Sequence, residues 1–286
     1  MSLRARIAEK KILVAPGVYD GLTAALATDA GFEALYLSGA AVAYTRLGRP
    51  DIGLTTASEM AETMALIADR TDLPVIMDAD TGFGNALNAR RTMVSYERAG
   101  AAALQVEDQT YPKRCGHLSD KSLIPVAEMT GKIAAMADAR RHDTLLVART
   151  DAIAVEGFSA AIDRAGAYID AGADILFIEA PRDSDELQKI VATFQGRIPL
   201  LANMVEGGAT PVSSASALEA MGFDLVIFPG GIVRALARTA QDYYASLFDA
   251  GSNTPFKDRM HDFDGLNDAI GTAQMLATGK RFDGTS

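Results

Sequence analysis

Three carboxylates in two short segments are the first residues of this chain whose types and spacing could do chemistry. Asp78 and Asp80 stand in "VIMDADTGFG", and Glu107 stands in "LQVEDQ". All three lie in or directly after apolar runs, where an unpaired ion is costly, so they require counter-charges, a metal ion or a ligand. No histidine cluster accompanies them, which favours a hard cation held through oxygen and water, Mg²⁺ (or Mn²⁺) before Zn²⁺.

The carboxylate cluster has a second interpretation. Its charge could be neutralised by Arg149 and Lys113 alone, without any metal ion. Asp51, in "GRPDIGLTT", could join a metal site through a water molecule, although an exposed loop aspartate is an equally ordinary interpretation. Both alternatives stay open at the level of the sequence.

The only cysteine of the chain, Cys115, stands in "YPKRCGH" beside Lys113, Arg114 and His117. Neighbouring cations lower the pKa of a thiol towards neutrality, which suits a group that donates or takes a proton. The whole segment "YPKRCGHLSDKS" is polar, which argues against a buried, inert cysteine. We expect a mobile loop that closes over a substrate and excludes water.

Short apolar runs that alternate with alanine-rich helical segments must position these residues. We expect strands at 12–18, 34–38, 75–80, 103–107, 145–149, 175–179, 200–204 and 225–228. We expect helices at 57–70, 88–99, 126–140, 158–171, 185–194 and 232–248. Eight parallel strands of this kind predict a (β/α)8 barrel of the α/β class, with a doubly wound open sheet as the competing architecture.

The length and composition predict one domain over residues 1–286. A chain of 286 residues that is 49% hydrophobic and 22% charged can bury a single large core. From Asp249 onward the sequence contains no ninth strand and predicts a helical extension, 249–286, of short amphipathic helices. These helices either exchange between subunits of an oligomer or cover the bottom of their own barrel.

Polar residues follow most of the predicted strands, at the barrel end where enzymes of this architecture carry their reactive groups. They are Ser38, Gly39, Asp78, Asp80, Glu107, Asp108, Arg149, Asp151, Glu179, Asn203, Glu206 and Pro229. Helix capping could explain some of the Asp and Ser positions. It does not explain Arg149 and Glu179, whose charges lie in or directly after the apolar runs.

Several classes of function are disfavoured. A formal charge of −10 without a basic stripe argues against nucleic acid as a partner, and the apolar runs are too short for membrane insertion. The glycines of "DTGFGN" and "EGGATP" fall short of a dinucleotide fingerprint or a phosphate loop. A lone cysteine and the lack of a signal-peptide pattern predict a cytoplasmic protein.

Six segments in order, "YLSGA", "DADTGFGN", "VEDQ", "KRCGH", "ARTDA" and "NMVEGG", closely resemble the isocitrate lyase/phosphoenolpyruvate mutase superfamily over nearly the whole chain. The resemblance implies a Mg²⁺-dependent (β/α)8 barrel that acts on small 2-oxo or 2-hydroxy carboxylates. It also implies a homotetramer, built as a dimer of helix-swapped dimers.

The resemblance implies a role for each matching residue. The metal ion would be held most closely by Asp80, and through water by Asp78, Glu107 and Asp51. The substrate would contact Tyr36, Ser38, Gly39, Ala40, Lys113, Gly116, His117, Arg149, Glu179, Asn203 and Pro229. A basic group in the region of Tyr36 and Glu107 would remove a hydroxyl proton, and Cys115 would protonate the departing carbanion.

The thiol and two departures suggest a branch of the superfamily. Phosphoenolpyruvate mutases and phosphonopyruvate hydrolases typically lack this cysteine, which favours a carbon–carbon lyase. Methylisocitrate lyases share "KRCGH" and "GATP", whereas "NMVEGG" and "FPGG" look more like the branch that cleaves 2-alkylmalates, dimethylmalate and oxaloacetate.

The expected reaction converts a 2-hydroxy di- or tricarboxylate, such as 2-methylisocitrate or 2,3-dimethylmalate, into a 2-oxo acid and a second carboxylate. Pyruvate is the expected oxo acid, and succinate or propionate the other product. The alternatives are a phosphonopyruvate or carboxyphosphonoenolpyruvate mutase, an oxaloacetate hydrolase, and a non-catalytic protein that binds oxo acids. Carboxyphosphonoenolpyruvate mutases retain a cysteine at this position, which keeps the mutase alternative open.

Overall fold

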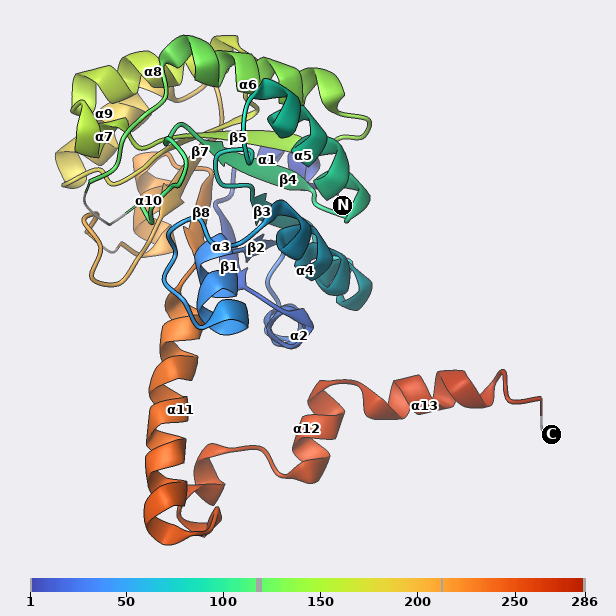
Figure 1. Ribbon diagram of the computed structural model, residues 1–286. Helices are drawn as coiled ribbons and strands as arrows, with labels where there is room; N and C mark the ends of the chain where they lie inside the picture. The colour runs from blue at the N-terminus through green and yellow to red at the C-terminus, as the bar shows by residue number, and fades with distance from the viewer. Residues whose placement is uncertain (1, 117–119, 212, 285–286) are drawn as a thin grey trace. The chain divides into compact units, whose positions relative to one another are not determined.

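Eight parallel strands close into a barrel in the computed structural model, which describes residues 2–116, 120–211 and 213–284 (Figure 1). Each strand pairs with the next along the chain, and the last pairs with the first. The strands are β1 (Leu13–Val18), β2 (Leu35–Leu37), β3 (Val75–Asp78), β4 (Ala103–Glu107), β5 (Leu145–Thr150), β6 (Ile175–Ile178), β7 (Leu200–Asn203) and β8 (Leu225–Phe228). The predicted (β/α)8 barrel is confirmed, and the open sheet is excluded.

The apolar strands are explained by burial on both faces. In β6, Ile175 and Phe177 belong to the core that fills the barrel, whereas Leu176 and Ile178 belong to a second core packed against the surrounding helices. Strands with two covered faces read as continuous apolar runs, because neither face meets water.

The helices of the barrel lie around the strands (Figure 1). They are α1 (Leu3–Ala8), α2 (Gly21–Asp29), α3 (Gly39–Val42), η1 (Ala43–Leu47), α4 (Ala57–Arg70), α5 (Ala86–Arg98), α6 (Val126–Ala139), α7 (Ala152–Val155), α8 (Phe158–Asp170), α9 (Ser184–Phe194) and α10 (Ala215–Met221). A capping box between Thr56 and Glu59 begins α4 at the predicted residue. The helices shorter than three turns were not predicted, since they carry too little periodicity.

Four strands end earlier than predicted, namely β2, β3, β6 and β7, and the ends of β2 and β3 meet at the candidate site. Strand β2 stops at Leu37 because Ser38 caps α3, its hydroxyl accepting a hydrogen bond from the Ala41 amide. Strand β3 stops at Asp78 because Asp80 adopts a left-handed conformation, with φ 45°. The chain therefore turns out of the sheet at the first acidic residues.

The structure divides into two compact units, Met1–Gly231 and Ile232–Ser286. Beyond the barrel the elements are α11 (Gly231–Ala250), η2 (Thr254–Arg259), α12 (Phe263–Ala269) and α13 (Thr272–Lys280). The described residues of this tail contain helices and no strand, in line with its sequence. The single-domain organisation and the exchange of helices stay predictions. Among the described residues no helix is long and apolar enough to cross a membrane.

Candidate active site

Asp78 and Asp80 meet the start of α3 at the carboxyl end of the barrel. The two carboxylate oxygens of Asp78 accept hydrogen bonds from the backbone amides of Asp80, at 3.1 Å, and of Gly39, at 3.3 Å. A Cβ on Gly39 would lie 2.9 Å from Asp78 Oδ2, so only glycine allows this approach. The predicted neighbours Ser38, Gly39 and Ala40 therefore lie beside the acids.

Lys113 is the counter-charge of this acidic group. Its Nζ lies 2.6 Å from Asp51 Oδ1 and 2.9 Å from Asp80 Oδ1, and all three side chains are buried. Burial raises the pKa of Asp80 to about 6, although the charge of Lys113 acts to lower it. Burial also acts to lower the pKa of Lys113, but Asp80 and Asp51 raise it well above its usual value. The lysine therefore stays a cation.

The acids fit a metal ion that is held largely through water. In the described part of the chain, no three His, Cys, Asp or Glu side chains form a ready-made metal-binding group. Asp80 Oδ1 is nevertheless buried, and among those residues it accepts no hydrogen bond of acceptable geometry, although Lys113 Nζ lies close. Mg²⁺ commonly binds through one or two carboxylates and keeps several waters. Asp80 Oδ1, a buried carboxylate oxygen whose nearest counter-charge is Lys113, has Asp78 and Asp51 nearby and meets that requirement.

Arg149 on β5 lies at the centre of a second charged group. Its Nε and Nη2 donate to the two carboxylate oxygens of Asp151 at 2.9 and 3.0 Å. Its Nη1 lies 3.3 Å from Glu107 Oε2, and its Nη2 lies 3.4 Å from Glu179 Oε2. The guanidinium also stacks 5.2 Å from the centre of the Phe177 ring. Three carboxylates thus fix the orientation of one arginine.

Glu107 and Tyr36 lie on inner positions of β4 and β2. Glu107 accepts a hydrogen bond from Gln109 Nε2 at 2.9 Å, and the Tyr36 hydroxyl donates to Gln105 Oε1 at 3.0 Å. Burial raises the pKa of Glu107 well above its usual range, against the opposing charge of Arg149. Burial likewise raises the pKa of Tyr36, which keeps its hydroxyl protonated.

The thiol-bearing segment lies against both charged groups. The Cys115 amide donates to the Asp51 carbonyl at 3.2 Å. A Cβ on Gly116 would lie only 2.4 Å from Arg149 Nη2 and 2.8 Å from Glu179 Cγ. Gln109 holds the preceding residue, accepting from the Arg114 amide and donating to the Arg114 carbonyl. His117, a predicted site residue, lies outside the described residues.

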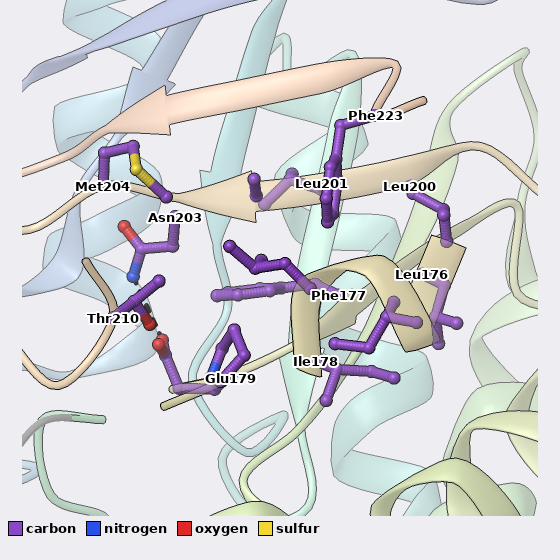
Figure 2. Close-up of a pocket in the computed structure, with 14 residues that line it drawn as sticks. Leu176, Phe177, Ile178, Glu179, Leu200, Leu201, Asn203, Met204, Thr210 and Phe223 are labelled. Atoms are coloured by element: carbon purple, nitrogen blue, oxygen red, sulfur yellow. Dashed lines mark hydrogen bonds between the residues drawn. The ribbon is translucent and has the colours of Figure 1, made fainter. Parts of the chain in front are cut away.

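Glu179 and Asn203 form the wall of the site that follows β6 and β7. Figure 2 shows their side chains pointing toward one another, with Asn203 Nδ2 donating to Glu179 Oε2 at 3.1 Å. Asn203 Oδ1 and the buried hydroxyl of Thr210 find no hydrogen-bond partner among the described residues. Pro229, after β8, lies next to β1, where its carbonyl oxygen would be 2.2 Å from a Cβ on Gly17.

The barrel gathers most of the predicted residues into two groups, one of acids around Lys113 and one around Arg149, whereas Pro229 lies beside β1 and joins neither group. Two residues that the prediction left out, Gln109 and Lys121, complete the hydrogen bonding of these groups. Asp151 also takes part, and the prediction placed it directly after a strand without giving it a role. Nothing in the sequence indicated the contacts of Gln109 and Lys121, because both depend on how the loop folds back.

Fold and site together define an enzyme of the (β/α)8-barrel class, with its polar groups at the carboxyl ends of the strands. A sequence model of the family described as phosphoenolpyruvate phosphomutase matches residues 3–248. The chain belongs to this family, which lies within the isocitrate lyase/phosphoenolpyruvate mutase superfamily, as predicted.

Curated relatives cover almost the whole chain. A 2,3-dimethylmalate lyase of Eubacterium barkeri is 41% identical over 270 residues, which is 94% of this chain and 93% of the relative. A 2-methylisocitrate lyase of Aeropyrum pernix is 45% identical over 269 residues, which is 94% of this chain and 86% of the relative. The prediction of an enzyme of the lyase kind within this superfamily is confirmed.

Solved structures agree with the fold in detail. An oxaloacetate acetylhydrolase in complex with the inhibitor 3,3-difluorooxalacetate superposes with a TM-score of 0.94 and 33% identity, covering 100% of this chain and 97% of that chain. A phosphonopyruvate hydrolase in complex with oxalate and Mg²⁺ superposes with a TM-score of 0.88 and 30% identity, covering 99% of each chain. The same barrel therefore carries more than one chemistry among the relatives.

Proposed function

We propose that this protein is a Mg²⁺-dependent lyase that cleaves the bond between C2 and C3 of a 2-hydroxy di- or tricarboxylate. The substrate is 2,3-dimethylmalate, 2-methylisocitrate or another 2-alkylmalate, and the products are a 2-oxo acid such as pyruvate and a second carboxylate. The two curated relatives are named for substrates of this kind. In both of these substrates, C3 carries a carboxylate, so breaking the bond between C2 and C3 leaves a carbanion that this carboxylate stabilises.

One observation carries the proposal, namely the closeness of the thiol-bearing segment to the charged groups. The Cys115 amide donates to the Asp51 carbonyl, and the next residue, Gly116, lies so close to Arg149 and Glu179 that an added Cβ would overlap both side chains. A proton donor carried on this segment can reach a substrate carbon that is bound between Arg149 and the acids.

The residues divide the reaction between them. The Arg149 guanidinium, already oriented by Asp151, binds substrate oxygens, and the segment of Ser38, Gly39 and Ala40 at the start of α3 binds the oxo-acid carboxylate. A base in the region of Glu107 and Tyr36 takes the hydroxyl proton. The bond between C2 and C3 breaks, C2 becomes a ketone, and the electron pair remains on C3 as an aci-carboxylate. The Cys115 thiol then gives its proton to C3.

The proposed metal site is the acidic group around Asp80. Asp80 would be the direct ligand, and Asp78, Glu107 and Asp51 would hold water molecules of the ion. When bound, Mg²⁺ supplies positive charge for the oxygens of the 2-oxo product. Together with Arg149 and Lys113 it lets a protein of formal charge −10 bind an anionic substrate.

A panel of substrates tests the proposal. Release of pyruvate or another 2-oxo acid is measured from 2,3-dimethylmalate, 2-methylisocitrate and further 2-alkylmalates, with Mg²⁺ present and again after treatment with EDTA. We expect turnover of at least one compound that stops with EDTA and returns with Mg²⁺ or Mn²⁺. No turnover across the panel in Mg²⁺ would contradict the lyase assignment.

Oxaloacetate hydrolysis is a second candidate, because the chain superposes closely on an oxaloacetate acetylhydrolase. Release of acetate and oxalate from oxaloacetate, measured in parallel, distinguishes it. A phosphonopyruvate or carboxyphosphonoenolpyruvate mutase would instead move the phosphorus signal in ³¹P NMR, which the family description motivates. If calorimetry shows that an oxo acid binds but none of these reactions occurs, the result would support the alternative of a non-catalytic binding protein.

We further propose a cytoplasmic homotetramer, a dimer of dimers that exchange their C-terminal helices. Large apolar side chains of the second unit are strongly exposed, among them Phe248 at 90%, Phe263 at 83%, Met275 at 74% and Phe282 at 79%. Exposed apolar side chains in such numbers are typical of helices that pack on a partner. A second copy of this chain is the occupant that the proposal names. The lone cysteine supports a reducing compartment.

A further inference from the structure

A buried ion pair links the thiol-bearing segment to the arginine group. Lys121 Nζ donates to Asp151 Oδ1 at 2.9 Å, and the same ammonium group donates to the carbonyl oxygen of Gly116. The side chain of Lys121 is 2% exposed and that of Asp151 is fully buried. Burying a lysine is costly unless its charge is paired, so this geometry is strongly specified.

Asp151 is fixed from several sides. It precedes α7 but does not cap that helix, because its carboxylate is used by Arg149 and Lys121. Its backbone amide donates to Asp108 Oδ1 at 2.9 Å. Asp108 is held in turn by the hydroxyls of Thr150 and Tyr168, each at 2.7 Å. Asp151 is therefore a rigid anchor, and Lys121 attaches the loop to it.

The two hydrogen bonds of Lys121 reach Asp151 and the Gly116 carbonyl, and both of these acceptors belong to residues that contact Arg149. Asp151 orients Arg149 through a bidentate pair, and the Gly116 backbone packs on Arg149 Nη2 without room for a Cβ. Moving the Gly116 carbonyl would shift its neighbour Cys115 with it. Moving Asp151 would rotate the guanidinium.

We propose that Lys121 and Asp151 are positioning residues, which hold the Cys115–Gly116 backbone and the Arg149 guanidinium in register for proton transfer. The inference rests on the proposed function, in which Cys115 is the proton donor. Neither residue touches the reacting atoms. A role limited to neutralising buried charge would affect stability without affecting the thiol.

The first test is Lys121→Met, which keeps an unbranched side chain one atom shorter than lysine and removes both hydrogen bonds. Asp151 keeps Arg149 as its partner, so we expect a folded protein by circular dichroism. On the best substrate of the panel, kcat should fall roughly 10- to 100-fold with KM changed far less, because misplacement of a catalytic group acts mainly on the chemical step. Lys121→Arg should recover part of the loss, and Lys189→Met, an exposed lysine on α9, should change nothing.

A double-mutant cycle with Asp151→Asn separates positioning from simple loss of charge. If the two residues act as one unit, Lys121→Met should cost little further kcat in the Asp151→Asn background. Fully additive losses of kcat would contradict the proposal.

The second test does not depend on turnover. Cys115 is the only cysteine, so the rate of alkylation by iodoacetamide reports this segment alone. We expect Lys121→Met to change that rate several-fold, while Lys189→Met leaves it unchanged. Rates and kcat within twofold of the unmodified protein would overturn the inference. If the substrate panel itself shows no activity, the alkylation rates still decide the positioning role, so the two failures can be told apart.

Discussion

One glycine sets how closely the thiol-bearing segment approaches the charged groups. Gly116 lies where any side chain would overlap Arg149 and Glu179. Backbone contact of this kind excludes water from the space between the loop and the arginine, which strengthens every charge interaction there. The residue next to the proton donor is therefore as constrained as the donor itself.

We predict that Gly116→Ala lowers kcat/KM by roughly 100-fold, because the added methyl must push the loop or the guanidinium out of place. Steady-state kinetics on the best substrate checks this. Gly131→Ala is the matched control, since Gly131 lies within α6 with open space around its Cα and should stabilise the protein slightly. Equal activity of Gly116→Ala and the control would contradict the close contact.

We predict that Cys115→Ser lowers kcat by two or more orders of magnitude, roughly the contribution of a positioned general acid. The hydroxyl is similar in size to the thiol but a much weaker acid, so the binding of Mg²⁺ should be unchanged. Single-turnover kinetics and metal titration by calorimetry measure the two effects separately. Near-normal turnover in this variant would remove the acid role from Cys115.

The residues of the site could be predicted largely because a barrel gathers the ends of its strands at one rim. This rule alone predicts that Asp78, Glu107 and Arg149 lie at the same rim of the barrel. The pairing of Lys113 with Asp51 was not predicted, since it joins two loops that are far apart in the sequence. Lys113 is the counter-charge that the interpretation without a metal requires, and the buried Asp80 Oδ1, which accepts no hydrogen bond of acceptable geometry among the described residues, is what the metal interpretation requires.

At the scale of elements, β5 and the turn after it hold a buried group of charges that depends on a single carboxylate. Arg149 at the end of the strand and Lys121 on the loop both depend on Asp151. Burial acts to raise the pKa of Asp151, but the two cations lower it to about 2, from an ordinary value of 3.8. A carboxyl group whose pKa is depressed in the folded protein stabilises the fold at pH values above its ordinary pKa. This stability is lost as the pH falls from the ordinary pKa through the lower pKa of the folded state.

We predict that the Asp151→Asn variant is less stable than the unmodified protein at pH 7 by about 3 kcal/mol, since two buried cations lose their anion. The difference should narrow by about 1 kcal/mol at pH 3, where the carboxyl is largely protonated in the unfolded chain but remains largely ionised in the folded protein. Urea unfolding at both pH values measures it. Asp69→Asn, an exposed position on α4, is the control, and a difference independent of pH would contradict the prediction.

The ends of elements could be predicted where a side chain marks them. Helix α4 begins at a capping box, and the sequence indicates this box by the spacing of Thr56 and Glu59. The early end of β3 could not be predicted from the sequence, because Asp80 takes a left-handed backbone conformation that non-glycine residues rarely adopt. Its amide is held by Asp78, a contact between two residues that the sequence pattern assigned to the strand.

At the scale of the whole molecule, the second unit offers surface that its own fold leaves uncovered. Phe263 on α12 and Met275 on α13 are among its most exposed apolar side chains. Apolar side chains in such numbers lower solubility unless a partner covers them. The proposed exchange of helices between subunits gives them that cover.

We predict that the double variant Phe263→Glu, Met275→Glu reduces the molar mass in solution to that of a smaller assembly, because charges at an apolar interface are costly to bury. Light scattering coupled to size-exclusion chromatography measures the mass. Lys280→Glu, an exposed position at the end of α13, is the control. An unchanged mass in the double variant would count against assembly through these helices.

The pairing of β8 with β1 has a consequence for how copies of this chain can meet. A closed ring of strands has no free edge, so its backbone amides and carbonyls offer no template on which a strand from another molecule could add. Contact between folded copies must then be made by side chains on the outer helices and loops, and amyloid-like stacking requires the ring to open first.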